Sequence, residues 1–369
     1  TTGAAGAGHG TSVSAIVAAT DAYGVEDRGV TSAIVDSWKT SNVDPISGAC
    51  RRQPDFVAAG FENAVQNDEI INASFGFEFE AGNTAEGLQI ENIANDAFVT
   101  GAVVIAATGN SGAEGNESVT APGSAPNVIG VGAITESGDV PDYSGRGPSY
   151  IGGRVKPDLL GPTDVTTACA SSASCGDVFG GTSAASPMVA GAAAQILDVF
   201  DSAGGFDTID PQLVPGTIYS TLIGFGTPLS GGATAGSFNN TEGAGVLDLG
   251  KTSCARWRWG TISLGEGEIE SREINIVTST NNVRVAAWWS DAPNGADLGH
   301  REVELGFCKN GGCTVSAQSN SVFQQIVEPS IDPGTWEIRV QSPPSSPFGG
   351  DRIVHYFFYA EWPEWQCTI

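Results

Sequence analysis

The feature that most limits the possible folds of this chain is an alternation between two kinds of hydrophobic segment across residues 10–250. Short apolar runs bounded by turn residues are typical of strands buried on both faces of a parallel sheet. Four such runs are TSAIVDSW (31–38), EIINASFG (69–76), AVVIAATG (102–109) and NVIGVGAI (127–134). Between them, residues 55–66 and 85–101 have apolar side chains at helical spacing. This alternation predicts an α/β domain in which helices cover both faces of a parallel sheet.

After Arg256 the hydrophobic pattern changes to an alternation with period two, which is typical of antiparallel strands. The segments are REINIVTS (272–279), NVRVAAWWSD (282–291), REVELGFC (301–308), TWEIRVQS (335–342) and DRIVHYFFYAEW (351–362). Since 369 residues exceed the usual size of one domain, we expect an α/β domain over residues 1–255 and a smaller antiparallel β-sandwich over residues 256–369. The boundary is placed within residues 243–256.

The charge of the chain argues against one large class of partners. Its 42 acidic and 16 basic residues give a formal net charge of −26, which repels phosphate backbones, so we expect no nucleic-acid binding. No uninterrupted apolar stretch reaches the roughly 18 residues of a membrane span, so we expect no membrane partner. No cofactor is expected to be required. Structural calcium stays possible, although no segment matches the DxDxDG calcium loop.

The seven cysteines have spacings that suit disulfides in an oxidising compartment better than zinc or redox pairs. The predicted pairs are Cys169–Cys175, Cys308–Cys313 and Cys254–Cys367, with Cys50 left over. The chain opens without the features of a signal peptide, which suggests a processed, secreted protein. The alternative is that all seven are reduced, buried thiols of a cytosolic protein.

Three segments contain candidate catalytic residues, and each has a simpler explanation. GHGTSVSAIVAA (8–19) places His9 at the start of an apolar helix, where a histidine beside glycines is usually only a loop residue. GGTSAASPMVAGAAAQIL (180–197) places Ser183 near a helix N-terminus, where it can be an N-cap or can lie among N–H groups that stabilise an anion. VVIAATGNSG (103–112) ends in Asn110, which is either a turn residue or an amide donor.

Taken together, the three segments supply the groups for nucleophilic attack on a carbonyl. A hydroxyl needs a base to take its proton, and the resulting anion needs preorganised donors. Ser183, His9 and Asn110 can take those roles in turn. HGTSV, ATGNSG and GTSAASPMVAG resemble the histidine, oxyanion-asparagine and serine motifs of the subtilisin-like serine peptidases (subtilases), in the order of that family.

The resemblance also implies a primary substrate pocket. EIINASFG resembles the strand that forms one wall of this pocket, and APGSAPNVIGVGAI resembles the segment behind it. Thr120 would lie near the base, where many relatives have glycine, and would disfavour large aromatic side chains. The implied pocket residues are Ser74, Phe75, Gly76, Ala107, Thr108, Gly109 and Thr120. The β-rich tail is similar to the jelly-roll domains that follow some subtilase units.

The triad of that family also includes an aspartate, for which this chain has no match. In subtilases it lies on a strand upstream of the histidine, but only TTGAAGAG precedes His9. That strand is central in the family's sheet, and its loss would leave buried backbone groups unpaired at about 1 to 3 kcal/mol each. We therefore expect a separate N-terminal peptide, or another part of a longer chain, to place this strand between residues 31–38 and 69–76.

The leading hypothesis is a serine endopeptidase that cleaves peptides or proteins through an acyl-enzyme. An alternative is a catalytically inactive subtilase-like protein that binds peptides or surfaces, which the missing aspartate favours and the three intact motifs oppose. A third possibility is a carbohydrate platform built from Trp288, Trp289, Trp362 and Trp365. Adjacent strand residues point to opposite faces, so at least one of Trp288 and Trp289 is expected in the core.

Overall fold

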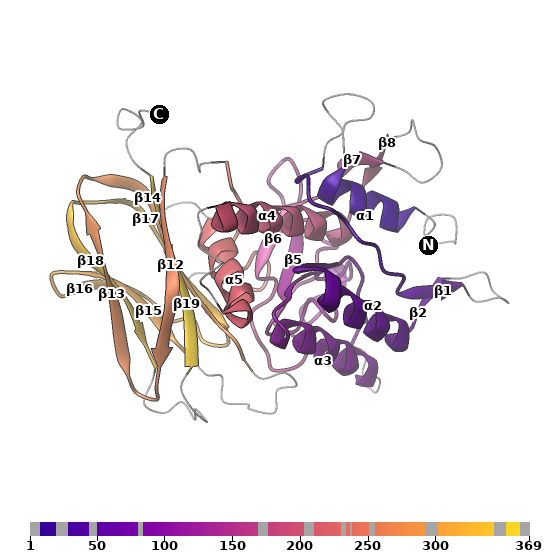
Figure 1. The fold of residues 1–369 in the computed structure, drawn as a ribbon, viewed down its shortest axis with the longest axis horizontal. Coiled ribbons are helices and arrows are strands. Elements are labelled where there is room, and N and C mark those ends of the chain that lie inside the picture. Colours follow the sequence, from indigo (N-terminus) through magenta and orange to yellow (C-terminus); the bar gives the residue numbers. More distant parts are fainter. Residues whose placement is uncertain are drawn as a thin grey trace.

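The computed structural model describes residues 8–19, 29–43, 50–79, 84–168, 176–202, 210–229, 234–236, 238–250, 255–291, 302–342 and 352–361. An α/β unit comes first in the chain and a β-sandwich follows, and the two lie side by side in Figure 1. Both predicted architectures are therefore confirmed.

A six-stranded sheet forms the centre of the α/β unit. Its strands are β3 (Ile70–Ala73), β4 (Val103–Ala107), β5 (Ile129–Ile134), β6 (Leu159–Pro162), β9 (Gly226–Thr227) and β11 (Val246–Leu247). They lie in the order β3-β4-β5-β6-β11-β9, and every neighbouring pair is parallel except β11 with β9. Three of the four predicted apolar runs thus form β3, β4 and β5.

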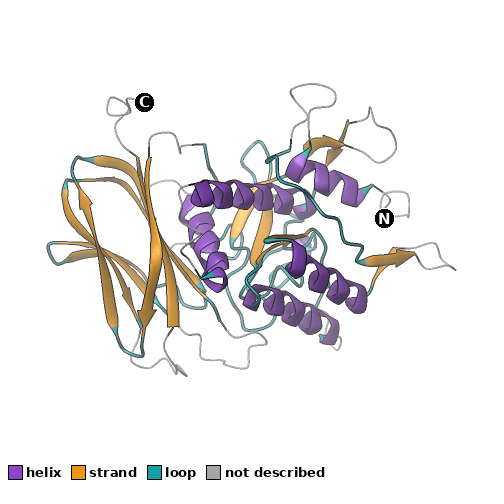
Figure 2. Ribbon diagram, viewed as in Figure 1, coloured by secondary structure: helices purple, strands orange, loops and turns teal. Residues whose placement is uncertain are grey.

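Helices cover both faces of this sheet because successive side chains of each strand point to opposite sides. The bounds of the helices are α1 (His9–Ala18), α2 (Pro54–Asn67), α3 (Ala85–Val99), α4 (Thr182–Ser202) and α5 (Val214–Phe225). Val104 and Ala106 of β4 belong to a core with α2 and α3, whereas Val103 and Ile105 belong to a core with α4 and α5. Figure 2 shows this layered arrangement, in which α1 packs against α4.

The length and composition of α4 would suit a membrane span. It has 21 residues, and most of its apolar length is buried inside the protein. Its buried residues include Ala185, Val189 and Ile196, which belong to the core against the sheet. In this fold α4 is therefore a core helix.

Two antiparallel sheets form the β-sandwich. One has the order β10-β17-β14-β19-β12, and the other has the order β13-β18-β15-β16. Their strands are β10 (Thr234–Ala235), β12 (Ala255–Leu264), β13 (Ile269–Ile276), β14 (Thr280–Trp289), β15 (Glu304–Lys309), β16 (Gly312–Ser316), β17 (Phe323–Ile331), β18 (Gly334–Gln341) and β19 (Arg352–Glu361). The five strands predicted after Arg256 are all present, whereas β12, β16 and β17 were not predicted.

The sandwich covers α5, so the two units share one hydrophobic core. Trp288 packs against Tyr219 of α5 with ring centroids 5.0 Å apart, whereas Trp289 belongs to the core between the two sandwich sheets. Their places in two different cores confirm that they point to opposite faces, and an exposure of 1% for each excludes them as a carbohydrate platform. Trp362 and Trp365 lie outside the described residues.

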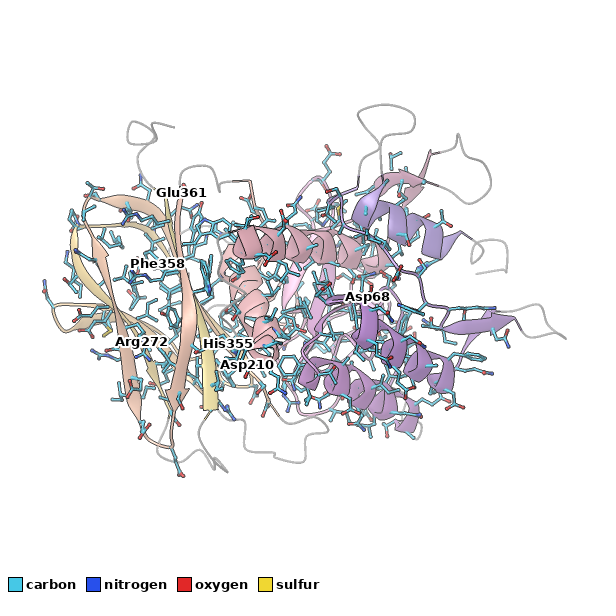
Figure 3. All side chains as sticks on the ribbon, in the orientation of Figure 1. Asp68, Asp210, Arg272, His355, Phe358 and Glu361 are labelled. Atoms are coloured by element: carbon cyan, nitrogen blue, oxygen red, sulfur yellow. A yellow bond between two sulfur atoms is a disulfide. The ribbon has the colours of Figure 1, made fainter. Side chains whose placement is uncertain are left out.

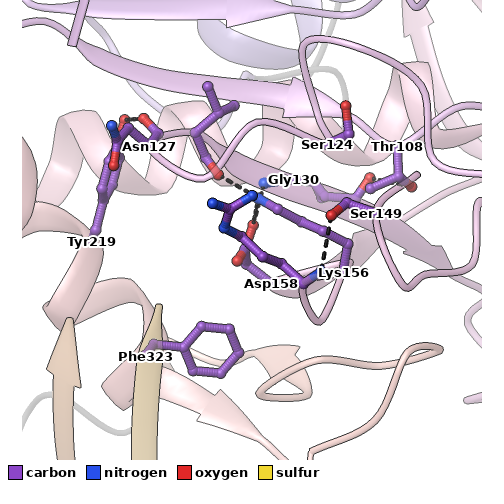
Figure 4. A network of polar contacts seen from close by, with 12 residues as sticks. Thr108, Ser124, Asn127, Gly130, Ser149, Lys156, Asp158, Tyr219 and Phe323 are labelled. Carbon is purple, nitrogen blue, oxygen red and sulfur yellow. Dashed lines mark hydrogen bonds and ion pairs between the residues drawn. The ribbon is translucent and has the colours of Figure 1, made fainter. Parts of the chain in front are cut away.

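Buried charges also join the two units. Arg154 donates from Nε and Nη2 to Asp291 Oδ2 at 3.1 and 2.9 Å, and both side chains are almost fully buried. Lys156 and Asp158 form a second buried ion pair, which lies within the α/β unit, with Nζ 2.6 Å from Oδ2 (Figure 4). His355 lies on β19 beside α5 (Figure 3), with its Nδ1 3.3 Å from Thr217 Oγ1.

The sheet ends at β3, which pairs only with β4 among the described residues. Residues 29–40 form neither helix nor strand, so the strand predicted at 31–38 is wrong. A strand needs a hydrogen-bonded neighbouring strand, and none of the described strands pairs with this segment, although Thr31 N donates to Val17 O at 2.8 Å. Ile34 is 95% exposed and Trp38 is 40% exposed, in contrast to the fully buried β4.

Two short hairpins complete the α/β unit: β1 (Ser41–Val43) with β2 (Cys50–Arg52), and β7 (Val165–Ala168) with β8 (Gly176–Phe179). In the sandwich, Cys308 and Cys313 form the predicted disulfide across β15 and β16, with an S–S distance of 2.09 Å. The pairs predicted for Cys169–Cys175 and Cys254–Cys367 lie outside the described residues.

Candidate active site

His9, Asn110 and Ser183 line one cavity of about 1590 Å³. Each residue comes from a different element, because His9 begins α1, Asn110 follows β4, and Ser183 lies in the first turn of α4. Side chains of β3 and of residues 33–41 line the same cavity. The three candidate catalytic groups therefore share one open space with the unpaired edge of the sheet.

A glycine turn positions Ser183 at the N-terminus of α4. Gly181 has φ +82°, a conformation that favours glycine, and a Cβ there would lie 3.1 Å from the Nδ2 of Asn110. Ser183 follows two residues later and is half-buried. The first N–H groups of a helix have no partners within it and carry the positive end of its dipole. This position suits a hydroxyl beside which a negative charge develops.

Asn110 is held in place by the start of α4. Its Oδ1 accepts hydrogen bonds from Thr182 N at 2.9 Å and from Thr182 Oγ1 at 3.1 Å. Because a backbone N–H can only donate, this contact assigns the amide oxygen to the helix side. The Nδ2 group is then the part of Asn110 that can donate to a ligand in the cavity. The amide is a preorganised donor close to Ser183.

Ser183 is tied to the segment that follows β3. Its Oγ donates to Ser74 O at 3.2 Å, and Ser74 Oγ donates to Ser183 O at 3.0 Å. In the part of the chain that the structure describes, no hydrogen bond joins Ser183 to His9. Catalytic hydrogen bonds are often completed only when substrate is bound, so this resting contact does not conflict with a nucleophilic role.

His9 has the environment of a neutral base. Its ring packs edge-on against Phe179, with centroids 5.2 Å apart. Burial of the imidazole, and secondly the positive charge of Arg52, lower the pKa of His9 below its ordinary value of 6.5. The ring is therefore unprotonated at neutral pH and can accept a proton. Within the described segments, no carboxylate is hydrogen-bonded to this imidazole.

The predicted substrate pocket forms part of the same cavity. Six of its seven predicted residues line the cavity: Ser74, Phe75, Gly76, Ala107, Gly109 and Thr120. Thr120 lies between Gly76 and Gly109, and a Cβ on either glycine would collide with its side chain. The prediction for Thr108 is wrong, because its side chain is fully buried away from the cavity and its Oγ1 donates to Val131 O at 3.1 Å. Successive residues point to opposite sides of the chain, so the neighbours of Thr108 line the cavity and Thr108 does not.

Arg52 is a cavity residue that the sequence analysis did not identify. Its guanidinium carbon lies 5.7 Å from the centroid of the Phe77 ring, and it shares the cavity with His9. A signal was present in the sequence, because CRRQP places two of only 16 basic residues side by side in a strongly acidic chain.

The motifs and their arrangement agree with a comparison against known families. The sequence model of the subtilase family matches residues 2–245. The chain belongs to the subtilase family. Among curated relatives, subtilisin E of Bacillus subtilis (strain 168) is 30% identical over 194 residues, which cover 52% of this subtilase and 46% of that protein. Subtilisin DY of Bacillus licheniformis is 30% identical over 197 residues, which cover 53% and 65%.

This subtilase spans about half the length of the first curated relatives it matches. An extracellular protease of Xanthomonas campestris pv. campestris is 31% identical over 171 residues, 46% of this chain and 27% of that protein. Among solved structures, the prenylagaramide maturation protease PagA is 25% identical with a TM-score of 0.49, over 65% of this chain and 79% of that chain.

The described residues contain no group of three or more His, Cys, Asp and Glu side chains that could hold a metal ion. The candidate catalytic residues that line the cavity are His9, Asn110 and Ser183.

Proposed function

We propose that this subtilase is a secreted serine endopeptidase that cleaves peptide bonds through an acyl-enzyme intermediate. The observation that carries the proposal is the hydrogen bond from Thr182 N to Asn110 Oδ1, which joins Asn110 to the turn of α4 that contains Ser183, in the cavity that His9 also lines. Family membership supports the same reaction. A base, a hydroxyl and an anion-stabilising donor are the minimum set for this chemistry.

In the proposed reaction, Ser183 Oγ attacks the carbonyl carbon of the substrate while His9 takes the hydroxyl proton. Asn110 Nδ2 and a backbone N–H at the start of α4 donate to the oxygen that becomes negative. His9 then gives the proton to the leaving amine, which departs and leaves an ester on Ser183. Water, deprotonated by His9, hydrolyses this ester and restores the hydroxyl.

We infer that the carboxylate partner of His9 is supplied by a segment outside residues 1–369 that adds a strand to β3. Three observations support this inference. β3 has an unpaired edge among the described residues, this edge faces the cavity, and Ile34 and Trp38 are exposed beside it. A carboxylate would hold the imidazole in the orientation and tautomer that a general base needs.

Replacing the nucleophile tests the reaction directly. We expect Ser183→Ala to abolish both peptide hydrolysis and labelling by a serine-directed phosphonate, with an unchanged circular-dichroism spectrum, because the change removes one oxygen from a helix position. Asn110→Ala should lower kcat by about 10²- to 10³-fold with KM little changed, which is the loss seen when the oxyanion-hole asparagine of subtilisin is removed. Undiminished turnover in Ser183→Ala would refute the assignment.

We propose that the substrates have small or medium-sized side chains at the primary pocket. Thr120 fills the space between Gly76 and Gly109, which shortens the pocket. One added methyl group in a pocket discriminates by about 1 to 3 kcal/mol, so the preference should be graded. A peptide library should show Ala, Leu and Met ahead of Phe and Tyr, and Thr120→Gly should reduce the difference. A strong aromatic preference in the unmodified protein would contradict this role of Thr120.

The second candidate function is an inactive subtilase-like protein that binds peptides in the same cavity. The observation that favours it is the absence of a carboxylate on His9 among the described residues. The phosphonate separates the two candidates, because it labels only a serine that a base can activate. A chain that binds peptides but never reacts with the phosphonate, in any preparation, would be the binding protein.

A further inference from the structure

The helix that carries Ser183 contains a proline that removes one of its hydrogen bonds. In an α-helix the N–H of each residue donates to the carbonyl four residues earlier. Pro187 lies inside α4 and has no N–H, so the helix supplies no such donor to the carbonyl of Ser183. The backbone of the proposed nucleophile therefore needs a partner from elsewhere.

Ser74 provides that partner from the segment after β3. Its Oγ donates to Ser183 O at 3.0 Å, and its side chain is 7% exposed, so water does not compete freely for this carbonyl. The two residues are 109 positions apart in the sequence. One hydroxyl thus replaces the backbone donor that Pro187 has removed.

Two further side chains direct the proton of Ser74 toward Ser183. Asn72 Nδ2 donates to Ser74 Oγ at 3.0 Å, and Ser186 Oγ donates to Asn72 Oδ1 at 2.7 Å. The amide of Asn72 occupies the acceptor side of the Ser74 hydroxyl, which leaves its proton for Ser183 O. Ser183 and Ser186 are one turn apart on α4, and Asn72 and Ser74 are two residues apart in the chain at β3. The four residues close a ring that ties the helix to the end of the strand.

We propose that Ser74 is a positioning residue that fixes the backbone of Ser183, and with it the nucleophile, relative to Asn110 and His9. The proposal rests on the proposed function, since it concerns the serine that reacts. Its physical basis is that a shift of about 1 Å in a reacting group can cost about 10²-fold in rate. Because Pro187 leaves the carbonyl of Ser183 without a helical donor, Ser74 can donate to this carbonyl and so fix the position of Ser183.

A double-mutant cycle between the two positions tests this role in the full chain. Ser74→Ala should lower kcat about 10- to 100-fold with KM changed less than about 2-fold. Pro187→Ala restores a backbone N–H that can donate to Ser183 O, so in that background Ser74→Ala should lower kcat by no more than about 2-fold. Ser14→Ala is the control, because Ser14 lines the same cavity and its hydroxyl contacts Ser37 instead of Ser183. Equal losses of kcat in both backgrounds would overturn the proposal.

A spectroscopic measurement separates this proposal from the proposed function. With ¹³C-carbonyl serine incorporated, the Ser183 resonance is assigned by its loss in Ser183→Ala. Ser74→Ala should move it upfield as the hydrogen bond is lost, and adding Pro187→Ala should move it back.

If the chemical shift of the Ser183 carbonyl is unchanged in Ser74→Ala, the hydrogen-bonded ring is refuted. A moved resonance with unchanged kcat overturns the positioning role and leaves the peptidase intact. Absence of any hydrolysis or phosphonate labelling in the unmodified protein overturns the proposed function, while the resonance still decides whether Ser74 holds Ser183.

Discussion

Around α5 the chain covers its own apolar surface, whereas around β3 a comparable surface stays open. Every residue from Pro215 to Phe225 is buried, and aromatic rings from the sandwich pack on this helix. Phe357 and Tyr359, for example, have ring centroids 5.2 and 5.4 Å from that of Phe225. Beside β3, by contrast, Ile34 is 95% exposed and faces a cavity of about 1590 Å³.

The two regions differ in whether the described part of the chain supplies a partner. The α5 side receives its partner from the same polypeptide, as apolar side chains plus the buried Arg154–Asp291 pair. The β3 side has apolar side chains and unpaired backbone groups but no described partner. Stability and function are thus separated in space, since the open region contains the candidate catalytic residues. Functional regions are commonly drawn from the less stable parts of a fold.

The largest expected effect comes from removing a tryptophan on the covered side. Trp288→Ala should lower the free energy of unfolding by about 3 to 5 kcal/mol, because it leaves a cavity against Tyr219. Trp38→Ala is the matched control on the open side, where the ring is 40% exposed and its Nε1 donates to Asp68 Oδ2 at 3.1 Å. This control should cost about 1 kcal/mol or less. Chemical denaturation measures both, and equal costs would remove the contrast between the two regions.

The buried ion pair should show the same contrast for charges. Arg154→Met leaves Asp291 buried without its main partner, which typically costs about 3 to 5 kcal/mol. Arg146→Met breaks a pair with Asp142, whose side chain is 95% exposed, so it should cost no more than about 1 kcal/mol. Thermal unfolding of the two variants provides the comparison. A small effect at Arg154 would mean that the sandwich is not held to the α/β unit through this pair.

Binding of the proposed strand should convert the open region into a covered one. Mass spectrometry of the protein isolated without denaturant would show whether a second segment accompanies this chain. A free segment at 100 times its Kd would stabilise the folded chain by about 2.7 kcal/mol. It should slow hydrogen exchange of the β3 amides, Ile70–Ala73, and raise the pKa of His9 from its lowered value.

The control is a segment with Asn in place of its carboxylate residue. It should still slow hydrogen exchange at β3 but should no longer raise the pKa of His9. Unchanged exchange at β3 would contradict docking at this edge.

Over a single pH unit, the smallest effect is the pH dependence of stability on the covered side. Burial lowers the pKa of His355 to about 3, from 6.5 for the exposed ring. Since the unfolded chain binds a proton between these values and the folded one does not, the free energy of unfolding falls as pH decreases. The slope should be about 1.4 kcal/mol per pH unit between 6.5 and 3 for this group alone. His355→Gln should flatten the curve in this window, and an identical slope in the variant would count against a buried neutral imidazole.

The sequence predicted the covered parts of the fold better than the open one, for a physical reason. The runs at 102–109 and 127–134 form β4 and β5 because each has partners on both sides. The run at 31–38 has a similar pattern, yet it forms no strand, since a pattern of side chains does not encode whether a neighbouring strand is present. The wrong strand prediction therefore concerns the edge of the sheet at β3, where no neighbouring strand is described.

The candidate site was predicted at the level of motifs and not at the level of contacts. His9, Asn110 and Ser183 lie in short segments whose glycines and helix start could be recognised directly. The link from Ser74 to Ser183 spans 109 residues, so no local pattern contains it. Pro187 was the one local sign of this link, because a proline inside a helix leaves the carbonyl four residues earlier without its helical donor.

The paired tryptophans of β14 have a consequence for strand register. The sequence VRVAAWW contains two identical pairs, so after a slip by one residue each face of β14 would still present one alanine and one tryptophan. Arg284 breaks this degeneracy. It is 3% exposed, and its Nη1 donates to the carbonyls of Phe225 and Gly226, at 3.0 Å each, where α5 ends. In the slipped register its charge would enter the apolar interior of the sandwich, so a single arginine selects which tryptophan belongs to which core.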